Sequence, residues 1–126
     1  MTVLAEARAH LRKAEEFLEL AELAESRDLF NGAASAAVTS GINAKDAVCL
    51  KLVGHTDKTE SHSDAVVELK AAGPAAAPLA TTLGRLLKLK NRSQYQPVGV
   101  ARSDARKAIE WARRLYEAAV AIVTDN

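Results

Sequence analysis

Apolar residues recur at alternating spacings of three and four along the first part of the chain. The members of this repeat are Leu4, Ala7, Leu11, Ala14, Leu18 and Ala21. Because an α-helix completes a turn in about 3.6 residues, this spacing places them on one side of a helix, with charged residues on the other. The pattern predicts an amphipathic helix that Thr2 can cap and that ends near Ser26.

A second helix is predicted from a cap at Asp28 to about Val53. Its first half is rich in small residues and contains Gly32 and Gly41. Glycine inside a helix costs about 1 kcal/mol relative to alanine, so we expect both glycines to permit close approach of a neighbouring helix backbone. The single cysteine, Cys49, is interpreted as a small buried apolar residue.

Two further helices are predicted after a polar loop. The third opens at Ser61, with Asp64 in a capping box, and ends at Gly73-Pro74. Its expected apolar face is made of Val66, Val67 and Leu69. The fourth begins near Pro74 or Pro78, with a stripe formed by Leu79, Leu83, Leu86 and Leu87.

The last helix is predicted to follow a loop over residues 91–100, where Pro97 and Gly99 break the periodicity. Ser103 is its expected cap, and Trp111 and Tyr116 are expected to pack within the bundle or at a dimer interface. Its inner face is formed by Ala105, Ile109, Ala112, Leu115, Ala119 and Ile122. The chain is therefore predicted to be all-α, an antiparallel up-and-down bundle of four to five helices forming one domain over residues 1–126.

Composition limits the classes of function. The 126 residues contain 17 Lys and Arg against 16 Asp and Glu, which excludes a globally basic nucleic-acid binder but leaves room for a basic patch. One cysteine excludes a disulfide framework. The chain has neither an apolar run long enough to span a bilayer nor a start typical of a signal peptide, so we expect a cytoplasmic protein that does not associate with membranes.

The charges are unevenly distributed. Residues 2–26 carry a local charge of −3, whereas residues 85–92 hold only basic charges. The basic residues of this segment are Arg85, Lys88, Lys90 and Arg92, and more follow at Arg102, Arg106, Lys107, Arg113 and Arg114. If the last two helices are neighbours, these groups could merge into a surface that contacts phosphates. The alternative is solvated cations near a helix C-terminus, where they meet the negative end of the helix dipole.

One more cluster combines histidines with carboxylates. Its residues are His55, Asp57, Glu60, His62 and Asp64. Mixed imidazole and carboxylate ligands can bind a metal, but this spacing is typical of no known metal motif, and loops collect such residues for other reasons. We predict no metal and no cofactor, and we assign His62 to the cap of the third helix or to a contact with the second.

The order of these helices and of the basic segment resembles the order found in proteins of the HEPN superfamily. The resemblance covers nearly the whole chain, from LRKAEEFLELAELAE through LFNGAASAAVTSGINAKDAVCLKLVG and ESHSDAVVEL to SDARKAIEWARRLYEAAVAIV. The family motif of the type L-R-N-x-A-D-Y-D-P corresponds here to the segment from Leu89 to Pro97, LKNRSQYQP. The resemblance implies a helical bundle that forms a homodimer with the motif near its two-fold axis. It also implies a small nucleotidyltransferase as antitoxin partner, since many members form such toxin–antitoxin pairs.

The resemblance also implies a chemistry. Many catalytic members are metal-independent ribonucleases in which an Arg holds the phosphate and a His, four to six residues on, moves the proton. Here Lys90 stands at the Arg position and Tyr95 at the His position, and no histidine follows His62. Tyrosine has a pKa of about 10 and lysine cannot grip a phosphate bidentately. Tyr95 is either a phosphate-contacting or modified hydroxyl, or a packing residue of the loop.

The leading hypothesis is a HEPN module that binds RNA, a nucleotide or a partner protein and is not an efficient nuclease. The candidate phosphate-binding residues are Arg85, Lys88, Lys90, Asn91 and Arg92. One alternative is a metal-independent ribonuclease toxin that uses Lys90, Arg92 and Tyr95 as catalytic residues. Another alternative is a purely structural, dimeric interaction bundle.

Overall fold

The chain folds into five helices, and the computed structural model describes residues 1–57, 62–95 and 99–125, with the backbone alone for residues 62 and 91–95. The helices are α1 (Val3–Ser26), α2 (Phe30–Val53), α3 (His62–Ala71), α4 (Ala77–Tyr95) and α5 (Arg102–Thr124). No strand occurs in these three ranges. The prediction of an all-α antiparallel bundle is therefore confirmed.

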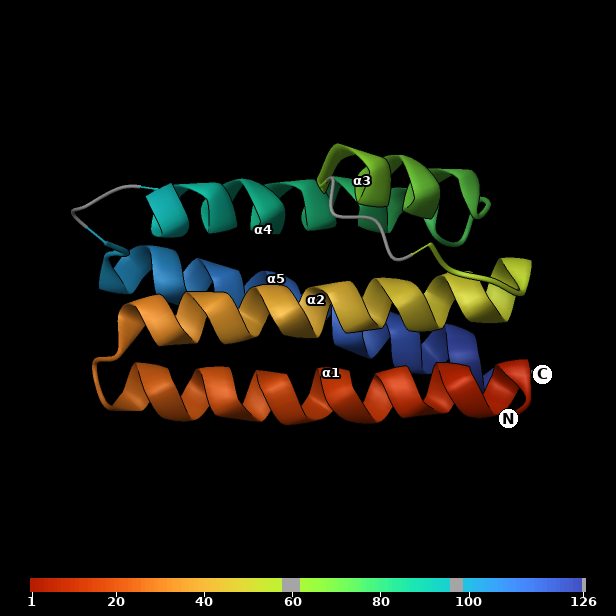
Figure 1. The fold of residues 1–126 in the computed structure, drawn as a ribbon, viewed down its shortest axis with the longest axis horizontal. Helices are drawn as coiled ribbons and strands as arrows, with labels where there is room; N and C mark the ends of the chain where they lie inside the picture. Colours follow the sequence, from red (N-terminus) through yellow and green to blue (C-terminus); the bar gives the residue numbers. More distant parts are fainter. Residues whose placement is uncertain (58–61, 96–98, 126) are drawn as a thin grey trace.

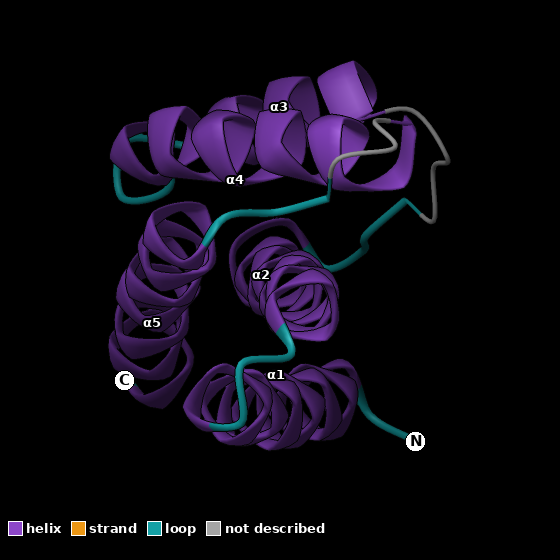
Figure 2. Ribbon diagram, turned by 90° about the vertical axis from the view of Figure 1, so that its left-hand side faces the viewer, coloured by secondary structure: helices purple, strands orange, loops and turns teal. Residues whose placement is uncertain are grey.

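Helix α2 is the central element of the bundle. It packs most extensively against α1 and α5, and it also contacts α4 and α3. Figure 2 shows α2 surrounded by α1, α5 and the α3–α4 pair, with α3 lying against α4. Both termini lie at the same end of the molecule, where Lys51 Nζ donates a hydrogen bond to the Asp125 carbonyl at 2.7 Å (Figure 1).

The interface between α1 and α2 is built from small side chains. Its fully buried alanines include Ala7, Ala14 and Ala21 of α1 and Ala33, Ala37 and Ala47 of α2. The buried Ser40 Oγ donates a hydrogen bond to the Ala14 carbonyl at 2.7 Å, across the two helices. Small residues let two helix backbones approach closely, and α1 and α2 form the most extensive helix pair of the bundle.

Only one of the two glycines of α2 is explained by close packing. A Cβ added to Gly41 would collide with the Leu86 side chain and lie 3.2 Å from Leu115 Cδ1, so α4 and α5 side chains occupy the space beside it. A Cβ added to Gly32 would meet nothing within 4 Å. The prediction of close approach is therefore wrong for Gly32, and at Gly41 the neighbours are side chains rather than backbone.

The predicted helix caps are correct at one helix and wrong at two, and the cap predicted at Ser61 lies outside the described residues. Thr2 caps α1, since its hydroxyl accepts a hydrogen bond from the Ala5 N–H at 3.0 Å. Asp28 has a positive φ of 59° and lies before the N-cap Leu29, so it cannot cap α2. Ser103 already lies inside α5, whose first turn is closed by hydrogen bonds from the Asp104 and Ala105 N–H groups to the Ala101 carbonyl.

Helix α4 is longer than the sequence predicted. Residues 91–95, expected to belong to a loop, continue the helix to Tyr95. The physical reason is that a proline ends a helix near its own position rather than six residues earlier, since it lacks an N–H donor and restricts the backbone of the residue before it. Pro97 itself lies outside the described residues.

The predicted apolar stripes are mostly buried, with two exceptions, of which Leu4 at the start of α1 is 38% exposed. In α4, Leu83, Leu86 and Leu87 are buried, and Leu79 packs against the core. In α3, Leu69 is fully buried, but the side chain of Val67 is 65% exposed, so its assignment to the inner face is wrong. Within the described part of the chain, none of the helices combines the length and apolar character needed to cross a membrane.

Candidate functional site

The predicted phosphate-binding residues lie along the C-terminal half of α4. The side chains of Arg85 and Lys88 are exposed, and Lys90 is partly buried. Asn91, Arg92 and Tyr95 belong to the last turns of the helix, but their side chains lie outside the described part of the structure. The structure therefore places Arg85 and Lys88 at the surface and leaves the predicted roles of Lys90, Asn91, Arg92 and Tyr95 as predictions.

The basic residues of α5 are directed instead toward the acidic helix α1. Arg106 Nε lies 3.0 Å from Glu25 Oε1, and Arg113 Nη2 lies 2.8 Å from Glu22 Oε1. Arg102 Nη2 lies 2.6 Å from the carboxylate of Asp28 in the turn that follows α1. These pairs place three of the five α5 cations against the acidic side chains of α1 and its following turn.

The remaining cations of α5 do not extend the α4 surface as a group. Arg114 Nη2 pairs with Glu110 Oε1 one turn earlier, at 2.5 Å, and Lys107 is an exposed residue outside the groove described next. The expectation that the α4 and α5 cations merge into one basic surface is thus wrong for the ion-paired arginines, although α4 and α5 do pack together.

A groove of about 690 Å³ runs between α3 and α4. Its apolar lining is formed by Val66, Val67, Ala77, Ala80, Gly84 and Leu87. Lys70 of α3 and Arg85 and Lys88 of α4 also line it. Lys70 was not predicted as a site residue; the topology brings it to Arg85 and Lys88 by folding α3 back along α4.

The groove has an excess of positive charge. Its lining contains three cations and no carboxylate among the described residues. Lys70, Arg85 and Lys88 make no ion pair with any residue whose side chain the structure describes. Cations that lack a protein counter-charge remain available to an external anion, so this groove is suited to a phosphate-bearing ligand.

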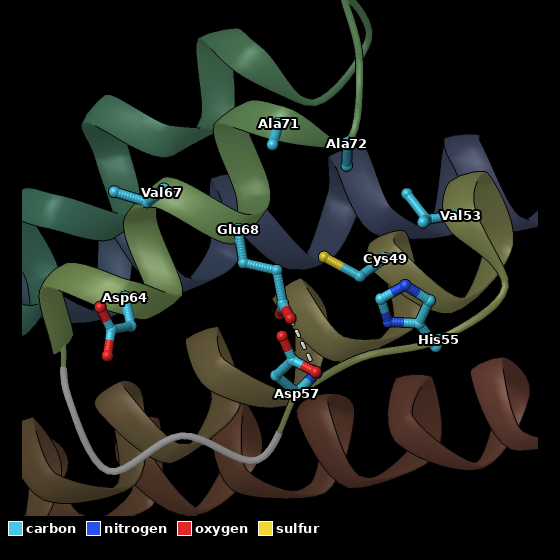
Figure 3. A pocket seen from close by; sticks show the side chains of 9 residues that line it. All are labelled: Cys49, Val53, His55, Asp57, Asp64, Val67, Glu68, Ala71 and Ala72. Atoms are coloured by element: carbon cyan, nitrogen blue, oxygen red, sulfur yellow. Dashed lines mark hydrogen bonds between the residues drawn. The ribbon is translucent and has the colours of Figure 1, made fainter.

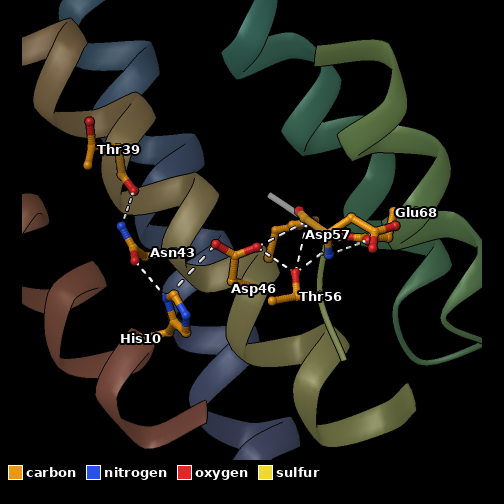
Figure 4. Close-up of polar contacts among 8 residues, drawn as sticks. His10, Thr39, Asn43, Asp46, Thr56, Asp57 and Glu68 are labelled. Carbon is orange, nitrogen blue, oxygen red and sulfur yellow. Dashed lines mark hydrogen bonds and ion pairs between the residues drawn. The ribbon is translucent and has the colours of Figure 1, made fainter. Parts of the chain in front are cut away.

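A second polar site lies inside the bundle, where the sequence predicted none. Lys45 of α2 has only 2% of its side chain exposed, and its Nζ pairs with the carboxylates of Asp46 (3.0 Å) and Glu68. Thr56 bridges the same groups, donating to Asp46 Oδ1 at 2.6 Å (Figure 4). The cluster joins α2, the segment after it and α3 through one buried cation.

The protonation of this buried cluster is set by two opposing effects. Burial by itself lowers the pKa of Lys45, but the hydrogen bond to Glu68 and the charge of Asp46 outweigh it and raise the pKa overall. Burial raises the pKa of Glu68, but hydrogen bonds from Lys45 and from the Asp57 N–H outweigh it and lower that pKa. Both groups are therefore held in their charged forms.

The cluster continues to α1 through a histidine. His10 Nδ1 lies 2.9 Å from Asn43 Oδ1 and 3.9 Å from Asp46 Oδ2. Asn43 Nδ2 donates to the Thr39 carbonyl, which leaves its Oδ1 as the acceptor of the His10 N–H. Figure 4 shows this chain of contacts running from α1 to α3.

A signal for the buried cluster was present in the sequence. Lys45 and Asp46 are the only charged residues between positions 30 and 50, and they interrupt a helix made almost entirely of small and apolar residues. Adjacent charges in a helix that must be buried need a partner. Glu68 lies on a different helix, so it could not be identified as that partner without the fold.

A cavity of about 550 Å³ lies between α3 and the end of α2. Figure 3 shows His55, Asp57, Asp64 and Glu68 around it, with Cys49 at its inner wall. Cys49 is 1% exposed, and burial raises the pKa of its thiol to about 12 despite the nearby charge of Lys45. This confirms the interpretation of Cys49 as a buried side chain, and such a thiol is unreactive.

The candidate metal ligands whose side chains the structure describes, His55, Asp57 and Asp64, do not assemble into a ligand set. Among the residues that the structure describes, no three His, Cys, Asp or Glu side chains are placed to hold a metal ion. Glu60 and the side chain of His62 lie outside the described residues. Trp111 and Tyr116 pack against the core, and the Tyr116 hydroxyl donates to Glu15 Oε2 of α1 at 3.0 Å.

Comparison with models of known protein families shows to which family this helical bundle belongs. The family model named HEPN domain matches residues 7–123, which is nearly the whole chain. The chain belongs to the HEPN family. None of the curated proteins compared with it matches. In this HEPN protein, residues 89–95, which we predicted to correspond to the family motif, form the last turns of α4 and directly follow Lys88 of the basic groove.

Proposed function

We propose that this HEPN protein binds RNA or a nucleotide through the phosphates, at the basic groove between α3 and α4. The observation that carries the proposal is the contrast between two sets of cations. Arg102, Arg106 and Arg113 are neutralised by acidic residues of α1 and the turn after it, whereas Arg85 and Lys88 have no ion pair among the described side chains.

The position of these two residues supports the proposal. Arg85 and Lys88 precede Lys90, Asn91 and Arg92 on the same helix, so the predicted motif residues would extend the basic surface along α4. Lys70 adds a third cation from α3 on the facing side of the groove. Lysine and arginine contacts to phosphates supply most of the affinity of proteins for nucleic acids without base recognition.

The test is a titration of fluorescently labelled RNA with purified protein, in which fluorescence anisotropy reports binding. The titration is repeated at a series of salt concentrations. We expect the double charge reversal Arg85→Glu and Lys88→Glu to abolish binding. Each single reversal should lower the slope of log affinity against log salt by about 1, because it removes one interaction with a phosphate. Lys107→Glu is the matched control, because Lys107 is an exposed cation on α5 outside the groove.

Two outcomes would contradict the proposal. Equal binding by the Arg85/Lys88 double variant and by the parent protein would mean that the groove cations do not hold the ligand. Equal weakening by Lys107→Glu would mean that net charge alone governs affinity. If the RNA is cleaved during the titration, and substitution of Lys90, Arg92 or Tyr95 abolishes the cleavage, the result would support the ribonuclease alternative instead of a binding module.

The homodimer and the nucleotidyltransferase partner stay predictions from the family resemblance. Light scattering at micromolar concentration tests the first, with a dimer mass expected. Co-purification with a nucleotidyltransferase encoded next to this chain tests the second.

A further inference from the structure

The groove between α3 and α4 contains more apolar surface than phosphate binding needs. Its lining includes Val66, Val67 and Leu87, and the Val67 side chain is 65% exposed. Inorganic phosphate or a bare polyanion would contact the groove cations and leave Val67 and the accessible part of Val66 in water, whereas Leu87 is buried beneath them. A ligand that covers both kinds of surface must carry an apolar, planar or aliphatic part close to its charge.

The floor of the groove is open at one position of α4. A Cβ added at Gly84 would lie 3.8 Å from Val66 Cγ2, so there is room for a methyl group but a longer side chain would project over Val66 and into the groove. Arg85 follows Gly84 directly, and Lys88 lies one turn further on. The open floor and the cations are therefore adjacent, as the base and the phosphate of a nucleotide are.

The size of the groove agrees with such a ligand. At about 690 Å³ it falls within the range of roughly 300–1,000 Å³ that is typical of small-molecule and cofactor sites. A base that is paired and stacked inside a duplex presents only its edges, whereas an unpaired base can leave the stack and place its face on apolar side chains.

We propose that the α3–α4 groove is a base subsite, in which one unpaired base of a single-stranded RNA packs on Val66 and Val67 while Arg85 and Lys88 contact the adjoining phosphates. This inference rests on the proposed function and deepens it, because it selects single-stranded RNA over duplex RNA. The charge excess of the groove favours this occupant over an apolar or basic segment of another protein.

The experiment compares three probes by anisotropy: a labelled single-stranded oligoribonucleotide, the duplex of the same sequence, and inorganic polyphosphate as a competitor. We expect the single strand to bind at least about tenfold more tightly than the duplex, since each stacked base contributes strongly to single-strand affinity. We expect polyphosphate to compete poorly at equal phosphate concentration.

Two variants test the floor of the groove without touching its cations. Gly84→Leu fills the groove, and we expect it to weaken single-strand binding about tenfold, while Gly84→Ala is the matched control and should bind like the parent. Val67→Asn changes an exposed side chain, so the fold is retained, and it should weaken the same interaction in the same direction.

The outcomes separate this inference from the proposed function. If polyphosphate competes fully, and if Gly84→Leu and Val67→Asn bind normally while Arg85→Glu with Lys88→Glu does not, the base subsite is wrong and the phosphate site stands. If the charge reversals have no effect, the proposed function fails. If the groove variants change the mass measured by light scattering and leave RNA binding intact, the groove is a protein-binding surface and the inference is overturned.

Discussion

Replacing Lys45 with methionine should lower the free energy of unfolding by about 3–5 kcal/mol, because it removes one partner of a buried charge cluster. Methionine has nearly the length of lysine, so the substitution leaves little cavity. It leaves the carboxylates of Asp46 and Glu68 without their cation, in side chains that are only 10% and 14% exposed. A loss of this size is a large part of the roughly 5–15 kcal/mol that stabilises an ordinary domain.

Urea denaturation, monitored by the circular dichroism signal of the helices, measures this loss of stability. Glu68→Gln is the matched control, because it keeps the shape of the side chain and leaves Lys45 paired with Asp46. Glu68→Gln should lower the free energy of unfolding by less than Lys45→Met does, by about 1.5–3 kcal/mol. The double variant Lys45→Met with Glu68→Gln should be less destabilised than the sum of the two single variants, because the second change relieves an unpaired charge left by the first.

The pH dependence gives a further check on the same cluster. The pKa of Glu68 is lower in the folded state than its unfolded value of about 4.3, so its contribution to stability is present above that value and is lost as the pH falls through the folded pKa. The stability gap between the parent protein and Lys45→Met should therefore shrink on acidification below about pH 4. A methionine variant as stable as the parent at neutral pH, or a gap unchanged by acid, would refute the reasoning.

Three other predictions follow from the packing. Gly41→Ala should destabilise the fold by about 1–3 kcal/mol, because the added methyl group meets leucines of α4 and α5. Gly84→Ala should instead stabilise it by about 0.5–1 kcal/mol, because alanine favours the helix and the added methyl group has room. Thermal unfolding measures both variants, and a higher stability of Gly41→Ala than of Gly84→Ala would contradict the packing. Cys49 should resist iodoacetamide at neutral pH until urea unfolds the protein, and rapid labelling of the native chain, read by mass spectrometry, would show that it is accessible. Thr2→Ala should cost about 1 kcal/mol in urea denaturation through loss of the α1 cap, and an unchanged midpoint would show that the cap contributes nothing.

The helices were predictable from the sequence because their signal is local. The apolar repeats of α1 and α5 identify which residues face the core, and Thr2 marks the start of α1. The errors came where tertiary contacts replace local rules. Asp28 lies in the turn after α1 and pairs with Arg102 rather than capping α2, and Val67 remains exposed because α3 packs on α4 through other residues.

The candidate site was predictable only in part. The basic run of α4 stands out in the sequence, so Arg85 and Lys88 could be named. Lys70, on the facing side of the groove, could not be named, because nothing local indicates that α3 folds back along α4. The same limit applies to the arginines of α5: sequence alone groups them with the α4 cations, and only the packing of α5 on α1 shows that three of them face acidic residues.

The α3–α4 groove is where we propose that this HEPN protein meets its ligand. Heteronuclear NMR of the isotopically labelled protein, titrated with a single-stranded oligoribonucleotide, tests this most directly. We expect the amide shifts to concentrate on α3 and on the second half of α4, around Lys70, Arg85 and Lys88, and α1 to be unaffected. Shifts centred on the α1–α5 face, or no shifts at RNA concentrations that saturate the anisotropy signal, would contradict the proposal.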